Sequence, residues 1–416
     1  MSDASAAPPP GDPAAARWRT PLVVIAAGCL ISLVGFGVRS AFGLFLEPMT
    51  LTQGWSRETF ALAMALQNLF WGLGLPFAGM LADRYGAPKV LAGGAVVYAL
   101  GVFGMAESES GLALQLTAGV VTGLGVAFTA FSLALAAMAR VAGPQRRSLA
   151  LGLGTAAGSL GQVLFSPFGQ ALIAGVGWHD ALVVMALSSL VILPLAFILP
   201  GASKETGDPL PDLGLGHALR EAAGHRGYVL LTIGFFVCGF HVAFITVHFP
   251  AYVSDLGLDP RIGAWALSLI GLCNIAGSLL SGAFGQRWSK RCGLAGIYFL
   301  RAIAIFVLLI SPKTPAVILI FAAVIGILWL STVPLTTGIV AQIFGVRYMA
   351  TLFGVVFLSH QIGSFAGVWL GGYLHDAVGS YDAVWWAGVV LGLLAAALHL
   401  PIDERPLTRK PHTATS

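Results

Sequence analysis

The most informative shortage in this sequence is charge. Of its 416 residues, 57% are hydrophobic and only 10% are charged, and the mean hydropathy is +0.86. An ordinary soluble domain carries about 25% charged residues. The apolar stretches repeatedly reach the ~20 residues that a helix needs to cross a bilayer. The composition therefore excludes a soluble fold and predicts a protein embedded in a lipid bilayer.

Cysteines and clustered catalytic side chains are also scarce. The four cysteines, Cys29, Cys238, Cys273 and Cys292, lie in apolar stretches or at a helix end, so we expect free thiols and no disulfide framework. The sequence contains no HExxH motif and no cluster of acidic residues, one of which a polytopic membrane enzyme would need at its active site. We therefore expect no enzymatic activity, no metal site and no cofactor.

The apolar runs predict an all-α membrane protein with twelve transmembrane helices. Abundant glycine suits such a fold, because small residues allow helices to approach closely in lipid; the chain has 53 glycines. The predicted spans are residues 22–46, 58–82, 89–106, 112–138, 148–173, 179–200, 228–252, 262–285, 292–311, 314–340, 349–375 and 381–400.

The basic residues predict the orientation of these spans. If both termini are cytoplasmic, only Arg57, Arg261 and Lys313 lie on the outer side, and all other Lys and Arg residues outside the spans lie on the inner side. An odd number of helices would destroy this bias. We therefore expect both termini in the cytoplasm, in a plasma membrane that is best matched by a bacterial inner membrane. The pI near 9.0 then reflects topology and does not indicate nucleic-acid binding.

Composition also divides the chain. The first residues are rich in Ala and Pro, without a basic region leading to a cleavage site, so the first apolar run is read as a span and not as a signal peptide. A polar segment in the middle of the chain separates six spans from six. The predicted parts are a disordered cytoplasmic tail (1–20), an N-terminal six-helix half (21–200), a cytoplasmic linker (201–227), a C-terminal six-helix half (228–400) and a cytoplasmic tail (401–416).

A charged motif is repeated once in each half. The segment from Gly79 to Lys89 reads G-M-L-A-D-R-Y-G-A-P-K, and a degenerate copy begins at Gly282 and aligns Arg287 with Arg84. A charged hinge between two spans, repeated once per half, is typical of transporters built from two repeats. The motif residues are Gly79, Asp83, Arg84, Gly86 and Lys89.

This motif resembles the loop between helices two and three of the major facilitator superfamily. The resemblance implies two pseudo-symmetric six-helix halves that rock around a substrate site between them, and a monomer. It also implies that Asp83 takes part in a cytoplasmic gate, for which Arg347, at the cytoplasmic start of the eleventh span, is the expected partner.

Placing the ionisable residues on the predicted spans reveals an imbalance of sign. Arg39 and Arg301 fall deep within spans, whereas no Asp or Glu lies at comparable depth. A charge within the membrane costs at least ~2.5–3.5 kcal/mol and therefore needs a partner or a watery cavity. An anionic substrate would supply that partner, because guanidinium matches a carboxylate in two parallel hydrogen bonds. Further candidate contacts are His241, His248, His360 and Gln361.

Each of these residues also has a structural interpretation. Arg301 could bind backbone carbonyls between helices, and a buried histidine could be a satisfied packing residue. Gln67 and Asn68 are amides within the second span, a position that commonly forms interhelical hydrogen bonds. Sequence alone leaves both interpretations open.

The first 95 residues show a narrower resemblance. Arg39 precedes Glu47 by eight positions, and Gly54-Trp55-Ser56 follows. This pattern is similar to the first helix and outer loop of monocarboxylate transporters, to which oxalate/formate exchangers are related. The resemblance implies that Arg39 contacts the substrate and that the substrate is a small organic anion, most simply a monocarboxylate.

One departure keeps the coupling mechanism open. Monocarboxylate transporters carry an Asp and an Arg in the eighth helix, and here residues 264–274 contain neither. A histidine could carry a proton instead, or the protein could exchange one anion for another. Efflux of larger drug-like compounds is an alternative function, and a transport-dead sensor is a further one.

Overall fold

A computed structural model describes residues 20–200, 215–345 and 349–407, and within these ranges the chain forms helices and no strand. They contain 11 helical stretches that are long and apolar enough to cross a membrane. One stretch, Gly152–Ala196, has 45 residues and would be roughly 70 Å long as a single helix, twice the hydrocarbon thickness. Gly177, with φ of 84°, lies between the fifth and sixth predicted spans in this stretch. The all-α fold with twelve spans is therefore confirmed.

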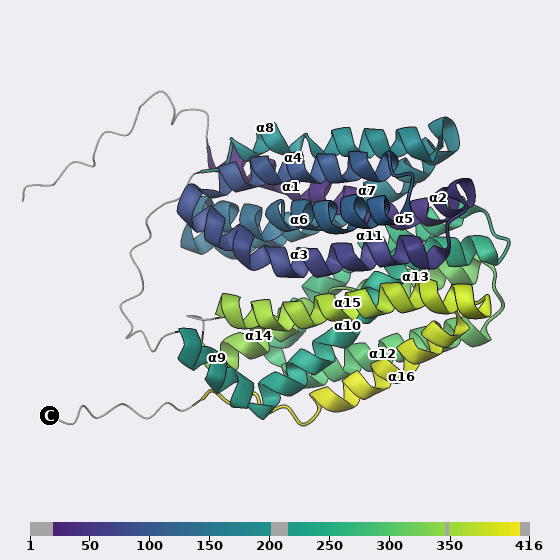
Figure 1. Cartoon of the computed structure of the whole chain (residues 1–416). Helices are drawn as coiled ribbons and strands as arrows, with labels where there is room; N and C mark the ends of the chain where they lie inside the picture. Colours follow the sequence, from purple (N-terminus) through teal and green to yellow (C-terminus); the bar gives the residue numbers. More distant parts are fainter. Residues whose placement is uncertain (1–19, 201–214, 346–348, 408–416) are drawn as a thin grey trace, which may run out of the picture.

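The N-terminal half forms one bundle (Figure 1, purple to teal). Its first span is interrupted by a 3-10 turn, and its fourth begins with a π-helical segment. Its elements are α1 (Pro21–Ser40), η1 (Phe42–Phe45), α2 (Leu46–Gln53), α3 (Arg57–Tyr85), α4 (Ala87–Ala106), α5 (Gly111–Leu114), η2 (Gln115–Val121), α6 (Thr122–Phe128), α7 (Phe131–Ser189) and α8 (Ile192–Ala196).

The C-terminal half forms a second bundle beside the first (Figure 1, green to yellow). Part of the predicted linker is helical, because α9 lies within it. The elements are α9 (Leu215–Gly224), α10 (Arg226–Asp255), α11 (Pro260–Arg287), α12 (Lys290–Ile310), α13 (Pro315–Leu328), α14 (Thr332–Phe344), α15 (Met349–Val378) and α16 (Asp382–His399). The exact boundaries of the two halves and of the tails stay a prediction.

Two equivalent spans, the fourth and the tenth, are broken near their middle. The fourth breaks between α6 and α7, at residues 129–130, and the tenth between α13 and α14, at residues 329–331. In a bilayer the freed backbone groups must be satisfied within the protein. Interrupted spans at corresponding positions of two repeats commonly mark the binding site of a transporter.

The two halves touch at one end of the bundle and lie apart at the other. At the end where α3 begins, here called the Arg57 end, a Cβ on Gly372 would meet Ala61 across the interface. Near the centre, Gly72 of α3 contacts the side chain of Gln361 of α15. Further along the same helices, toward the end where α1 begins, Gly79 and Gly354 have no described atom within 4 Å of a Cβ. The structure is therefore closed at the Arg57 end.

Candidate functional site

Arg39 lies in the last turn of α1, where the helix ends at the 3-10 turn. Its Nη2 donates to Oδ1 of Asn68 in α3 over 2.7 Å, and its guanidinium lies 4.4 Å from the ring centroid of Trp71. The C-terminal end of a helix carries a partial negative charge, which favours a cation there. Helix end, amide and indole together hold the guanidinium inside the membrane.

None of these partners neutralises Arg39. Among the described residues no carboxylate lies within ion-pair distance of it, and its Nε is buried without an acceptor. The indole Nε1 of Trp71 is also buried and unpaired. Both residues line a cavity of about 20 Å³, together with Thr129 and Ala130 at the break in the fourth span. A cavity of that size holds about one water molecule, so a larger ligand requires the site to widen.

The opposite wall of the interface comes from α15. Gln361 packs against Gly72, and its Nε2 is a third buried donor without an acceptor. Phe357 meets Trp71 edge to face, with ring centroids 5.3 Å apart, and stacks on His360 with centroids 5.5 Å apart. Unpaired N–H donors therefore occur on both halves where the halves meet. A ligand that only accepts hydrogen bonds, such as a carboxylate, matches this set.

Arg301 is buried within the C-terminal half and has protein partners. It donates from Nη2 to the carbonyl oxygen of Leu328 over 2.6 Å and also to that of Trp329, where α13 ends. Its Nη1 lies 3.5 Å from Sγ of Cys238. The negative end of α13 supplies much of the counter-charge that this arginine needs. These contacts favour the structural interpretation, and a role in substrate binding stays a prediction.

His241 and His248 of α10 each bond to a backbone carbonyl of their own half. Nε2 of His241 lies 2.8 Å from the carbonyl oxygen of Gly388, and Nε2 of His248 lies 2.8 Å from that of Val368. Because a carbonyl only accepts, both Nε2 atoms carry the hydrogen. His360 differs, since its Nδ1 lies 3.2 Å from Oε1 of Gln361 and its ring stacks on Phe357, two α15 side chains that contact α3. The predicted contacts at positions 241 and 248 are thus not brought together with Arg39.

The gating motif lies at the end of the bundle opposite Arg57. Arg84 is exposed and lies 5.2 Å from the ring of its neighbour Tyr85, and Gly86 adopts φ of 90° between α3 and α4. Lys89 and Arg287 are exposed. The side chain of Asp83 and the whole of Arg347 lie outside the described residues. The predicted gate between them therefore stays a prediction.

Sequence reasoning missed two partners of Arg39. The sequence predicts an interhelical hydrogen bond for Asn68, which it forms, but does not identify Arg39 as the partner, and Trp71 carries no distinguishing signal. On a helix, residues 68 and 71 share a face because they are three positions apart. A polar and an aromatic residue at that spacing in the second span, opposite a buried arginine, is the signal that could have located them.

The sequence matches a known protein family. The family model described as Major Facilitator Superfamily matches residues 28–367 and, in a second alignment, 231–415. Monocarboxylate transporter 13 of Rattus norvegicus is 26% identical over 382 residues, which cover 87% of this chain and 84% of that protein. The uncharacterized MFS-type transporter YcxA of Bacillus subtilis (strain 168) is 24% identical over 386 residues, which cover 90% of this chain and 93% of that protein.

A solved structure shares the fold. The crystal structure of a bacterial homolog of the human lysosomal transporter Spinster superposes with a TM-score of 0.73 at 16% sequence identity, covering 92% of this chain and 97% of that one. The family match extends over most of the sequence, and the fold agrees with it. The chain is a membrane transport protein that belongs to the major facilitator superfamily.

Proposed function

We propose that this protein moves small organic anions, most simply monocarboxylates, across a plasma membrane by alternating access, as a monomer with both termini in the cytoplasm. Arg39 binds the carboxylate, and Trp71 and Gln361 donate further hydrogen bonds to it. One observation carries the proposal: three buried N–H groups, on Arg39, Trp71 and Gln361, have no acceptor, and no described carboxylate pairs with the guanidinium. The relatives named monocarboxylate transporters support the same substrate class.

The size of the site limits the substrate. The cavities that contact Arg39 are of only about 20 and 10 Å³ in this structure, which is closed at the Arg57 end. Separation of the halves is needed to admit even a small acid, and binding at their interface would then draw them together. A substrate with one carboxylate suits the single guanidinium, since a second buried anionic group would need a second cation.

The residues at the site are compatible with two coupling mechanisms, proton symport and anion exchange. His360 stacks on Phe357, which contacts Trp71 of the other half, and a histidine at this position is able to carry a proton, which would support symport. Exchange of one anion for another needs no titratable group. Both mechanisms use the same contact between carboxylate and Arg39.

Uptake into proteoliposomes separates these possibilities. Labelled lactate, pyruvate and a short dicarboxylate are offered to vesicles that contain the wild type or Arg39→Gln, with and without an inward proton gradient, and with and without anion preloaded inside. Uptake by the wild type that is lost in Arg39→Gln supports the proposal, and the dependence on gradient or preload identifies symport or exchange. Absence of carboxylate uptake in every arm, from protein shown to be folded, would contradict it and favour efflux of larger compounds.

A further inference from the structure

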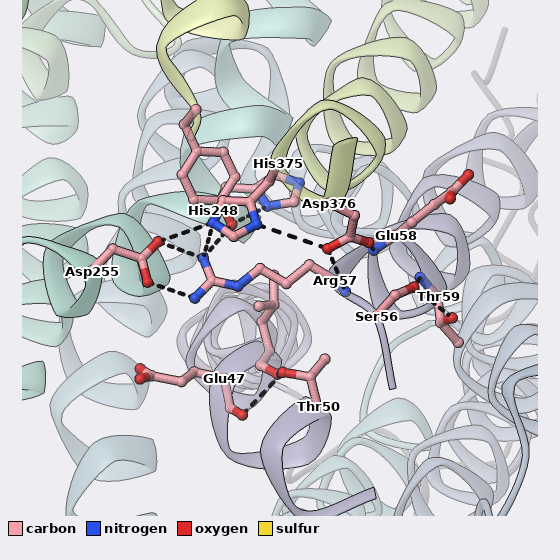
Figure 2. Close-up of polar contacts among 12 residues, drawn as sticks. Glu47, Thr50, Ser56, Arg57, Glu58, Thr59, His248, Asp255, His375 and Asp376 are labelled. Carbon is pink, nitrogen blue, oxygen red and sulfur yellow. Dashed lines mark hydrogen bonds and ion pairs between the residues drawn. The ribbon is translucent and has the colours of Figure 1, made fainter. Parts of the chain in front are cut away.

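A network of ionic contacts closes the interface at the Arg57 end, far from the cavity around Arg39. Arg57, the first residue of α3, donates from both terminal nitrogens to the carboxylate of Asp255, the last residue of α10, over 2.5 and 2.6 Å (Figure 2). The two side chains are 15% and 33% exposed. A bidentate pair is the strongest geometry for an arginine and a carboxylate, and partial burial reduces its screening by water. This pair joins the two halves.

A second carboxylate of the C-terminal half caps α3. Asp376 in the last turn of α15 accepts hydrogen bonds from the backbone N–H groups of Arg57, over 3.2 Å, and of Glu58, over 2.7 Å. The first N–H groups of a helix lack partners within it, and a negative charge is favoured there. One half of the transporter therefore caps a helix of the other. Trp369, about two turns before Asp376 in α15, donates to Oε1 of Glu58 over 3.1 Å.

Neutral side chains complete the network around Arg57. Nη1 of Arg57 donates to the hydroxyl oxygen of Tyr381 over 3.0 Å and lies 3.2 Å from Nε2 of His375. His248 carries its hydrogen on Nε2, so its Nδ1 accepts from the Tyr381 hydroxyl, over 3.2 Å. Burial raises the pKa of the Tyr381 hydroxyl well above its ordinary value, so the hydroxyl keeps the proton that it donates. The imidazole of His375 also lies 3.4 Å from Asp255 and 3.8 Å from Asp376.

We propose that the Arg57–Asp255 pair and the Asp376 cap of α3 form a latch that holds the two halves together at the Arg57 end and that opens once in each transport cycle. The inference rests on the proposed alternating access, though not on the identity of the substrate. The distribution of basic residues predicts that this end faces away from the cytoplasm. Each contact is polar and lies near the end of a span, so water can replace it when the halves part, which makes the latch reversible.

The charges make Arg57 the central residue of the latch. Its guanidinium is paired with the carboxylate of Asp255, and its backbone N–H donates to the carboxylate of Asp376. The Asp376 cap is made to backbone N–H groups and stays in place in either variant. Removing the guanidinium leaves the carboxylate of Asp255 without its cation, whereas in Asp255→Asn the guanidinium keeps its bond to Tyr381. Arg57→Gln should therefore open the latch more than Asp255→Asn does.

Distance measurements between spin labels test the latch without any substrate. The labels are carried by Glu109→Cys, in a loop of the N-terminal half, and Arg261→Cys, at the start of α11, both exposed and at the Arg57 end, in a background that lacks the four native cysteines. Double electron–electron resonance in nanodiscs should show a short-distance population in the parent protein. We expect this population to lose weight to a longer one in Asp255→Asn, and more so in Arg57→Gln. Arg57→Lys, which keeps the charge and loses the bidentate geometry, should fall between the parent and Arg57→Gln.

Two controls separate the latch from other effects. Arg405→Gln removes an exposed pair with Asp403, whose side chains are 90% and 65% exposed, and should leave the distances unchanged. Arg39→Gln should also leave them unchanged, so that a failure of the substrate proposal does not affect this test. Thermal melting of each variant verifies that it is folded; if Arg57→Gln does not fold, Asp255→Asn and Arg57→Lys carry the test. Distances that stay short in both folded charge variants of the pair would overturn the latch.

Discussion

The hydrogen bond between Arg39 and Asn68 orients both side chains inside the membrane. Nδ2 of Asn68 donates to the carbonyl oxygen of Met64 over 2.9 Å, which leaves Oδ1 to accept from Arg39 over 2.7 Å. The amide thus holds one terminal nitrogen of the guanidinium and cannot neutralise its charge. The remaining N–H groups are left for a ligand, which is the basis of the proposed anion site.

A carboxylate placed at position 68 should inactivate this site. Asn68→Asp is nearly isosteric and puts a negative charge at hydrogen-bond distance from Arg39, so the protein supplies the counter-ion that we assign to the substrate. We expect loss of carboxylate uptake with normal folding, because a paired buried charge is tolerated better than an unpaired one. Uptake assays together with thermal melting measure both properties.

Asn68→Ala provides the matched comparison. It removes the hydrogen bond to a charged group, worth about 1.5–3 kcal/mol, without adding a charge. Substrate affinity should then fall while the maximal rate is less affected. Uptake by Asn68→Asp at the level of the wild type would show that the charge of Arg39 is not needed by the substrate.

Arg301 should matter for stability and not for substrate affinity. Its replacement by Gln leaves the carbonyl groups of Leu328 and Trp329 without their donor at the break in the tenth span. An unsatisfied buried polar group costs about 1–3 kcal/mol, so Arg301→Gln should lower the melting temperature in detergent. Arg39→Gln should melt close to the wild type. If Arg39→Gln melted at a lower temperature than Arg301→Gln, and if Arg301→Gln bound substrate more weakly than the wild type, Arg301 would be a substrate contact instead.

Gly43 should be needed for closure at the Arg57 end. A Cβ at this position would collide with the backbone carbonyl oxygen of Thr246 in α10, across the interface between the halves. Gly43→Ala should therefore hold the halves apart at this end and slow transport, which uptake and the spin-label distances both report. Gly93→Ala, at a position with nothing within 4 Å of the new Cβ, should leave both unchanged. Equal behaviour of the two variants would argue against close contact at position 43.

The sequence predicted the fold well because hydropathy and the positive-inside rule both depend on composition over whole spans. The breaks at residues 129–130 and 329–331 could not be predicted. A run of apolar residues does not show where a backbone carbonyl accepts from a side chain, such as Arg301, instead of from the next turn of the helix. Arg39 could be identified as a candidate because its charge is unusual within a span. The latch could not, because Arg57, Asp255 and Asp376 each resemble a solvated loop residue, and only the three-dimensional arrangement brings them together.

The measurement that tests the account most directly is a binding titration of purified protein with pyruvate, compared with an uncharged ester of the same acid. If Arg39 binds the carboxylate, the wild type should bind pyruvate and not the ester, and Arg39→Gln should bind pyruvate roughly 10- to 100-fold more weakly, the equivalent of one hydrogen bond to a charged group. Arg39→Lys should recover part of the affinity, since it keeps the charge and loses the planar donor fork. Equal affinity of the folded wild type and Arg39→Gln for pyruvate would contradict the proposed anion site.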